Sequence, residues 1–187
     1  MPPKFKFTRQ EIISNAVDIT REKGIDALTA RELASKLGSS PKPIFGLFEN
    51  MQEVRKEVIN SANNLYQSYI QNGMADSKYP PYKASGIAYI RFAKEEKELF
   101  KLLFMRDRTG ENIEENREEI RPILDIIMKN IGLSEDEAYY FHIELWIHVH
   151  GIATMIATNY LQWDISFIEN ALTDAYEGLK HRYTKGK

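Results

Sequence analysis

The chain has 187 residues, of which 43% are hydrophobic and 28% are charged, enough for one sizeable core or for a small module joined to a larger domain. It contains no cysteine, which excludes disulfides, thiolate nucleophiles and sulfur-ligated metal sites. The net charge of −2 argues against wholesale coating of nucleic acid, but eight Lys and Arg against five Asp and Glu make residues 1–48 basic and leave the remainder acidic.

The first 50 residues predict three short helices. Thr8 is a helix N-cap, and the helix behind it is expected to stop at Gly24. Thr29 opens the second helix, with Glu32 three residues later as the partner of a capping box. The buried face of the first helix is expected to contain Ile12, Ala16 and Ile19.

Two prolines in the sequence SSPKPIF, residues 39–45, are compatible with a third helix that begins at Ser40, but not with one that begins several residues earlier. Pro41 then takes the first helical position and Pro43 stays within the first turn, where N–H groups have no intrahelical partner. Gly38 suits the tight turn before it, because glycine adopts a positive φ at low cost.

A longer amphipathic helix is predicted over 51–73, capped by Asn50 and Glu53, and the loop at 75–83 with its two prolines is the best domain boundary. Its apolar stripe consists of Met51, Val54, Val58, Ala62, Leu65 and Tyr69. The expected organisation is a helix–turn–helix domain over 1–50, a connecting helix over 51–73 and a larger helical domain over 74–187.

The larger domain is also predicted to be helical throughout. Helices are expected over 83–95, up to Met105 and up to Ile131, where Pro122 either kinks the helix or marks its start. A capping box at Ser134 and Glu137 opens the next helix, whose segment 141–157 is apolar on almost every side and is therefore expected to be central and buried. Because no segment shows β alternation, the predicted fold class is all-α.

Residues 1–14 lack the apolar stretch of a signal peptide, and no run approaches the roughly 18 apolar residues of a membrane span. A cytoplasmic protein without a membrane partner is therefore expected.

Two short helices joined by LGSS, residues 37–40, have the layout of a helix–turn–helix, in which the second helix presents its N-terminal residues to the major groove of DNA. The same layout also occurs in helical proteins that do not bind DNA, so spacing alone leaves both interpretations open.

The sequence LTARELASKLGSSPKPIFGLFENMQEV, residues 28–54, resembles the DNA-binding segment of the TetR/AcrR family of bacterial repressors. The family pattern falls on Thr29, Leu33, Ala34, Gly38, Ser40, Phe45, Phe48 and Asn50. A second resemblance is the Trp-x-x-x-His-Gly pattern of the family's ligand domains, here Trp146, His150 and Gly151. The resemblance implies a homodimeric, DNA-binding transcriptional regulator with a mostly apolar effector pocket. The family usually has a tyrosine, which commonly contacts a phosphate, where this chain has Phe45.

The expected DNA contacts divide by role. Hydroxyls of Thr29, Ser39 and Ser40 are expected to position phosphates, and Lys4 and Lys6 to lie along the minor groove. Arg31 and Lys42 are expected to reach base edges, since Arg or Lys to guanine is the commonest specific contact. Pro41 and Phe45 complete the predicted DNA-binding set, although the Phe45 ring is expected to pack within the module.

Predicted effector contacts combine apolar bulk with, in several cases, a polar tip: Tyr66, Tyr89, Phe92, Phe104, His142, Trp146 and Val149. Ordinary core packing is the competing interpretation for each of them. Glu144 favours a cationic ligand if it faces inward and is a solvated charge if it faces outward. The predicted dimer interface consists of Gly151 in the central helix and a stripe of the last helix, Ile165, Ile168, Leu172, Ala175 and Leu179.

The predicted function is a ligand-responsive regulator of transcription, most simply a repressor that a small hydrophobic effector releases from a palindromic operator. A helical interaction module that does not bind DNA is one alternative. An enzyme is the other, although the sequence has no Gly-rich phosphate loop, H-E-x-x-H or G-x-S-x-G. No cofactor is expected. No pair among His142, His148 and His150 has the i,i+4 spacing of metal ligands on one helix face, so His150 is expected to form a hydrogen bond in the core or at an interface.

Overall fold

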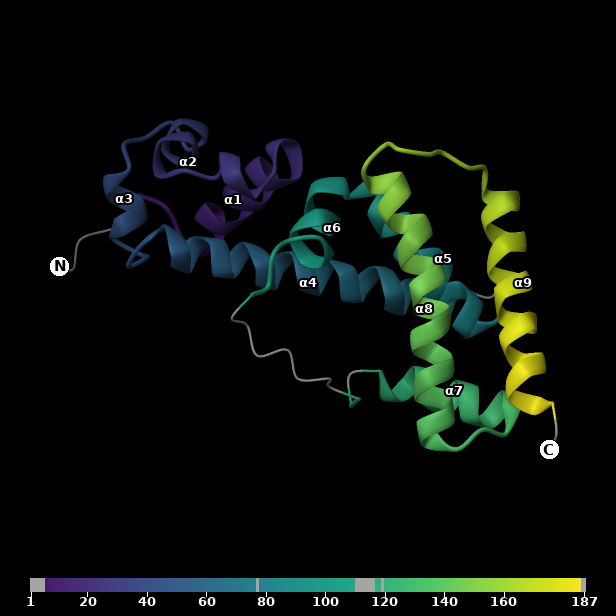
Figure 1. Cartoon of the computed structure of the whole chain (residues 1–187). Coiled ribbons are helices and arrows are strands. Elements are labelled where there is room, and N and C mark those ends of the chain that lie inside the picture. Colours follow the sequence, from purple (N-terminus) through teal and green to yellow (C-terminus); the bar gives the residue numbers. More distant parts are fainter. Residues whose placement is uncertain (1–5, 77, 110–116, 119, 186–187) are drawn as a thin grey trace. The chain divides into compact units, whose positions relative to one another are not determined.

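The computed structural model describes residues 6–76, 78–109, 117–118 and 120–185. Every regular element within these residues is helical, which confirms the predicted fold class (Figure 1). In chain order the elements are α1 (Arg9–Lys23), the short 3-10 helix η1 (Ile25–Ala27), α2 (Ala30–Lys36), α3 (Lys42–Phe45), α4 (Met51–Ala75), α5 (Pro81–Glu95), α6 (Lys97–Phe104), α7 (Arg121–Ile131), α8 (Glu135–Ala157) and α9 (Ile165–Thr184). None of the helices in these described ranges is long and apolar enough to cross a membrane.

The helices form two compact units. Unit 1 comprises Met1–Gln67 and Glu96–Arg106, and unit 2 comprises Ser68–Glu95 and Asp107–Lys187. Helix α4 therefore contributes residues 51–67 to unit 1 and 68–75 to unit 2, and α6 belongs to unit 1. These units differ from the predicted divisions at 50 and 73. The assignment of DNA binding to 1–50 and of ligand binding to 74–187 stays a prediction.

Unit 1 begins with a helix whose two ends lie where the sequence predicts them. The Thr8 hydroxyl accepts a hydrogen bond from the Glu11 amide at 3.1 Å, and the Glu11 carboxylate accepts one from the Thr8 amide at 2.7 Å. Gly24 closes α1 with φ 81°, and its amide donates to the Thr20 carbonyl at 2.8 Å. The large, fully buried side chains of unit 1 are Ile12, Ile19, Leu28, Leu33, Ile44, Leu99 and Phe100.

Unit 2 is built on α5, α7, α8 and α9. The Phe141 ring is fully buried and lies within 5.6 Å, centroid to centroid, of the rings of Tyr176 and Tyr183 from α9. Pro122 lies in the first turn of α7, so this proline marks the start of the helix and does not kink it. Gly132 ends α7 in the left-handed region, with φ 78°.

The expectation that residues 141–157 are buried on almost every side is wrong. Helix α8 buries Phe141, Leu145 and Val149, but Ile147 is 59% exposed and His148 is also exposed. One apolar face of the helix packs inside unit 2, and another apolar face lies on the surface of that unit. Hydropathy alone does not separate these two situations.

Candidate functional site

The segment between α2 and α3 forms a tight turn held by backbone hydrogen bonds. Gly38 has φ 59°, and the Ser39 amide donates to the Ala34 carbonyl at 2.9 Å. The Lys6 ammonium donates to the Gly38 carbonyl at 3.4 Å, which ties the segment before α1 to the turn. The glycine is needed here because a side chain in the left-handed region is strained.

Helix α3 is a single turn, and its start differs from the prediction by one residue. Pro41, not Ser40, holds the N-cap position, and Pro43 lies in the first turn. No side-chain hydrogen bond caps this helix, which corrects the expectation for Ser40. The prolines therefore define where the helical turn begins, as predicted, without help from the serine hydroxyl.

Two apolar side chains anchor α3 to the core of unit 1. Ile44 is fully buried and Phe48 is 2% exposed, while the amides of Leu47 and Phe48 both donate to the Ile44 carbonyl. Phe45 lies between these anchors in sequence but is 47% exposed. The expectation that the Phe45 ring packs within the module is therefore wrong, because Ile44 and Phe48 occupy the face that turns inward.

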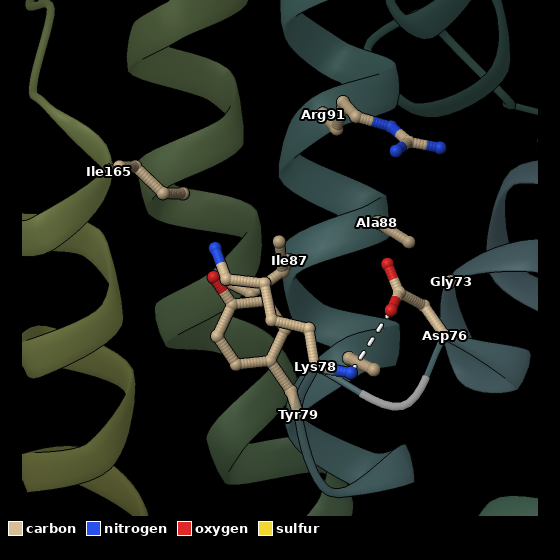
Figure 2. Close-up of a pocket in the computed structure, with 9 residues that line it drawn as sticks. Gly73, Asp76, Lys78, Tyr79, Ile87, Ala88, Arg91 and Ile165 are labelled. Atoms are coloured by element: carbon tan, nitrogen blue, oxygen red, sulfur yellow. Dashed lines mark hydrogen bonds between the residues drawn. The ribbon is translucent and has the colours of Figure 1, made fainter.

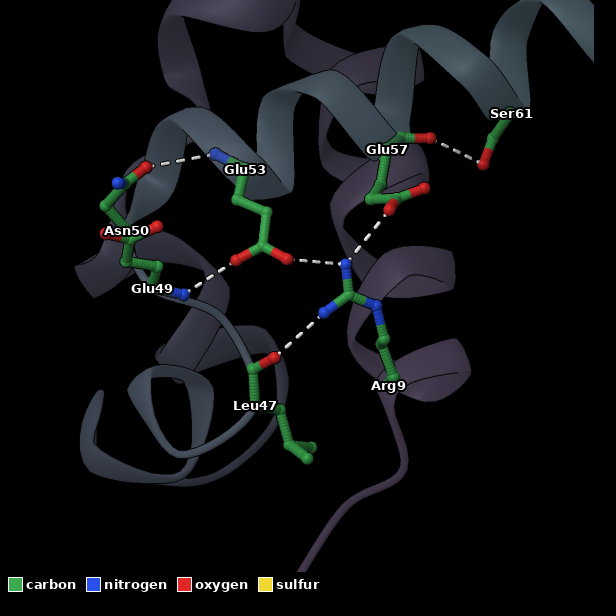
Figure 3. A network of polar contacts seen from close by, with 7 residues as sticks. All are labelled: Arg9, Leu47, Glu49, Asn50, Glu53, Glu57 and Ser61. Carbon is green, nitrogen blue, oxygen red and sulfur yellow. Dashed lines mark hydrogen bonds and ion pairs between the residues drawn. The ribbon is translucent and has the colours of Figure 1, made fainter.

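A guanidinium links α1, the segment after α3 and the start of α4 (Figure 3). One Arg9 nitrogen, Nη1, donates to the Leu47 carbonyl at 2.9 Å. The other, Nη2, donates to Glu53 at 2.7 Å and to Glu57 at 2.9 Å. The guanidinium carbon also lies 4.2 Å from the centroid of the Phe48 ring, a cation–π contact. These contacts hold the end of the α3 turn against two other helices.

The Glu53 carboxylate completes this arrangement by binding the chain just before α4. It accepts a hydrogen bond from the Glu49 amide at 2.7 Å, while the Glu53 amide donates to the Asn50 side chain at 3.1 Å. The predicted capping pattern is therefore present, with its return bond made to Glu49. The Glu49 amide and then the Arg9 guanidinium hold the pKa of Glu53 below its ordinary value, because both stabilise the carboxylate.

The basic residues of unit 1 differ in whether an acidic side chain neutralises them. Lys23 pairs with Glu32 at 2.6 Å, and Lys36 pairs with Glu22 at 3.2 Å. The exposed side chains of Arg31 and Lys42 form no ion pair within the described ranges of the chain. The two predicted base contacts are thus cations whose charge is available to a partner.

The remaining predicted DNA contacts differ in exposure and in the hydrogen bonds that they form. Lys4 lies outside the described residues. Thr29 caps α2 by accepting a hydrogen bond from the Glu32 amide at 3.2 Å, which leaves its hydroxyl proton available for donation. Ser40 is exposed and Ser39 is half-buried beside it. The Glu32 carboxylate pairs with Lys23, which takes the place of the second half of the predicted capping box.

The structure does not bring the predicted effector contacts together. Tyr66 and Phe104 belong to unit 1, where their rings pack edge to face at 5.1 Å and burial raises the pKa of Tyr66 to about 12. The other five belong to unit 2. They include Phe92, which is fully buried, and Val149, which is 7% exposed. Their roles in ligand binding stay untested predictions.

Histidines of α8 form hydrogen bonds inside unit 2. The His150 Nδ1 lies 2.9 Å from the Tyr89 hydroxyl, and its half-buried ring stacks on Trp146 at 4.7 Å. His142 lies 3.2 Å from the Tyr82 hydroxyl, and burial lowers the pKa of His142 to about 4, so it is neutral at pH 7. No cluster of His, Asp and Glu in the described ranges could hold a metal ion.

Glu144 lies at the surface of unit 2 with its side chain 35% exposed, which is the outward alternative, but it is paired. Its carboxylate accepts hydrogen bonds from the Arg182 guanidinium and, at 2.8 Å, from the Tyr183 hydroxyl. The residue therefore pairs α8 with the end of α9, which removes the reason to expect a cationic ligand there.

A shallow pocket of about 240 Å³ lies in unit 2 beside the end of α4 (Figure 2). Its floor is apolar, while Lys78 and Arg91 supply positive charge and Asp76 supplies negative charge. Both cations form exposed ion pairs. The Lys78 ammonium lies 3.6 Å from the Glu169 carboxylate, and the Arg91 guanidinium lies 4.0 Å from the Glu95 carboxylate. The lining residues are Gly73, Asp76, Lys78, Tyr79, Ala84, Ile87, Ala88, Arg91 and Ile165, none of which is a predicted effector contact.

The stripe of α9 that was expected to face a second copy packs largely inside its own unit. Ile168 and Leu172 are each 5% exposed, and Ala175 and Leu179 pack against the core around Phe141. Only Ile165 of this stripe is exposed. Large apolar side chains are instead exposed on α8, on the segment leading into α9 and on the first turn of α9, at Tyr140, Ile147, Met155, Tyr160, Leu161, Ile165 and Phe167.

Two comparisons with known proteins match segments of both units. Residues 82–176 match the family described as Tetracyclin repressor-like, C-terminal domain. The chain is also similar to an uncharacterized HTH-type transcriptional regulator of Mycobacterium tuberculosis, at 21% identity over 188 residues that cover 97% of this chain and 85% of the relative. The first match extends from α5 into α9, and the second includes the helix–turn–helix.

We predict that Arg9→Ala loosens the end of the α3 turn, because the Leu47 carbonyl loses its donor and two carboxylates lose their shared cation. Hydrogen exchange of the Leu47, Phe48 and Glu49 amides is expected to become faster. Lys36→Ala is the matched control, since it removes an exposed ion pair with Glu22 that lies outside this network. Unchanged exchange of all three amides in Arg9→Ala would show that Arg9 does not hold the turn.

Proposed function

Because the chain belongs to the tetracycline-repressor-like family of transcriptional regulators, we propose that it represses transcription by binding a near-palindromic operator and that a small hydrophobic effector releases it. The observation that carries the DNA-binding part is the helix–turn–helix of unit 1. Its turn is rigidly tied, and Arg31 and Lys42 are exposed without an acidic partner among the described residues.

In this proposal α3 enters the major groove and α2 braces against the backbone. Arg31 and Lys42 reach base edges, and the hydroxyls of Thr29, Ser39 and Ser40 donate to phosphates. The pairing of Lys23 and Lys36 with acidic side chains supports this division, because paired cations gain less from a phosphate than unpaired ones do.

A homodimer presents two such turns to one operator, with half-sites about one helical turn apart. We propose that the second copy covers the exposed apolar side chains of α8 and the segment before α9. Tyr140, Ile147 and Gly151 lie on one face of α8, because residues seven and four apart return to nearly the same direction. A methyl group added at Gly151 would have no neighbour within 4 Å, so a second helix has room to approach there.

The extent of this surface supports a second copy as its occupant. Tyr160 is 74% exposed, and Leu161 and Phe167 are also exposed beyond the end of α8. Exposed apolar groups in such number are unusual on a protein that stays monomeric. The surface also includes Gly151 and Ile165, which belong to the dimer interface predicted from the sequence.

The pocket at the end of α4 is our proposed effector site. Gly73 and Asp76 come from that end, so a bound molecule contacts a helix that belongs to both units. An effector that binds better to one position of α4 shifts the separation of the two recognition helices, and effector and operator then weaken each other's binding by the same factor.

The lining favours a particular chemical class of effector. Its apolar residues Ala84, Ile87 and Ile165 suit a short hydrocarbon chain, while Lys78 and Arg91 suit an acidic head group. Lys78 also lies 4.6 Å from the centroid of the Tyr79 ring, and Arg91 lies 5.1 Å from that of the Tyr69 ring. The ion pairs of both cations are exposed, and such pairs contribute little, so a ligand carboxylate can replace them.

We predict that selection from random DNA yields one short, near-palindromic site whose affinity falls linearly with the logarithm of salt concentration. Lys42→Ala is expected to cost about 1–3 kcal/mol of operator binding and to relax the preference at one base pair of each half-site. Lys129→Ala, an exposed lysine of α7 in unit 2, is the control and keeps full affinity. Recovery of no preferred sequence at moderate salt would favour the helical interaction module over a regulator.

We predict that octanoate raises the melting temperature and weakens operator binding, whereas octanol, which has the same chain length but no charge, does so less. Arg91→Glu is expected to abolish this preference for the acid. Lys94→Glu reverses a charge on the same helix outside the pocket and should leave the preference intact. Tighter operator binding with octanoate would indicate a corepressor, and equal effects of acid and alcohol would contradict the proposed head-group contacts.

We predict that Ile147→Asp converts a dimer to a monomer, because each copy would bury a charge without a partner in the interface. Molecular mass measured by light scattering after size exclusion gives the result directly. Asn130→Asp introduces the same charge at an exposed position of α7 and should leave the dimer intact. A dimer that persists in Ile147→Asp with unchanged dissociation constant would place the interface elsewhere.

A further inference from the structure

The exposed ring of Phe45 is unusual because its two anchoring neighbours are buried. Ile44 is fully buried and Phe48 nearly so, yet the Phe45 side chain leaves almost half of its surface in solvent. An exposed single hydrophobic residue needs no explanation by itself. This one, however, lies on the turn that the proposed function directs at DNA.

The ring is held in this position by structure on both sides. Pro41 and Pro43 restrict the backbone at the start of α3, and the amides of Leu47 and Phe48 bond back to Ile44. Arg9 then fixes the Phe48 ring and the Leu47 carbonyl. The Phe45 side chain is therefore presented by a rigid turn and loses little conformational freedom when it meets a partner.

The chemistry of the ring limits what it can recognise on DNA. A phenyl group has no hydrogen-bond donor, so it gains nothing from a phosphate oxygen and cannot form the phosphate contact of the tyrosine that the family usually has at this position. The major groove offers one apolar group that differs between base pairs, which is the 5-methyl group of thymine. Lys42 lies three residues earlier, on the same side of the helical turn, so the two side chains are neighbours on its outward surface.

We propose that Phe45 reads the 5-methyl group of a thymine next to the base pair contacted by Lys42, which makes it a specificity-determining residue. This inference rests on the proposed operator binding. The Phe45 contact takes the place of the phosphate contact of the tyrosine, and it distinguishes T·A from the other base pairs. Two symmetric thymines, one in each half-site, are read in this way by the dimer.

Deoxyuridine provides the direct test, because it differs from thymidine only by the missing 5-methyl group. Each thymine of the selected operator is replaced in turn, symmetrically in both half-sites, and binding is measured by fluorescence anisotropy. Burial of one methyl group corresponds to about fourfold in affinity, so the wild-type protein is expected to lose about fourfold for each methyl removed at one position. Replacement of thymines outside the site is the control.

The variants connect this loss to Phe45. Phe45→Ala is expected to bind the thymine operator more weakly and to be indifferent to uracil at the sensitive position. Phe45→Leu keeps an apolar side chain and is expected to retain part of the sensitivity. The side chain is exposed, so both variants are expected to keep the wild-type melting temperature, which is measured alongside.

Three outcomes separate this inference from the function on which it rests. Failure to select any operator overturns the proposed function and the thymine contact together. A selected operator that binds equally well with uracil at every position overturns the thymine contact alone. Uracil sensitivity that persists unchanged in Phe45→Ala assigns the methyl contact to another residue and also overturns the inference.

Discussion

The Arg9 guanidinium is the contact on which the presentation of α3 depends. It joins a backbone carbonyl after α3 to two carboxylates of α4, and it covers the Phe48 ring that anchors the turn. Arginine suits this position because its planar fork donates in several directions at once, whereas lysine is a point charge on a flexible stem. A helical turn of four residues has little stability of its own, so its position must come from such tertiary contacts.

The same anchoring explains how a short, proline-containing segment can display particular side chains. Ile44 and Phe48 turn inward, which leaves Lys42 and Phe45 on the outward surface. One of these side chains carries an unneutralised charge and the other an exposed ring. A cation and an apolar group are therefore presented from a single turn, and both are groups by which proteins read base edges in the major groove.

In unit 2, helices α8 and α9 each have one face in the core and one face exposed to solvent. Phe141 and Leu172 face the core of the unit, while Ile147 and Phe167 lie exposed. The buried face forms the core of the unit, and the exposed face is the surface that we propose a second copy covers. We propose that the effector site lies at the end of α4, the helix shared with unit 1, so that ligand binding and operator binding would act on one element.

The sequence by itself determined the fold class, the helix ends at Thr8 and Gly24, and the helix–turn–helix layout, because caps, glycines and prolines act on the backbone locally. Tertiary structure alone decided three other matters. It joined Arg9 to acidic residues more than 40 positions away, it exposed Phe45, and it turned the α9 stripe inward. Periodicity shows that a helix face is apolar, but only the packed structure shows which surface covers that face, because burial depends on residues that lie far apart in the chain.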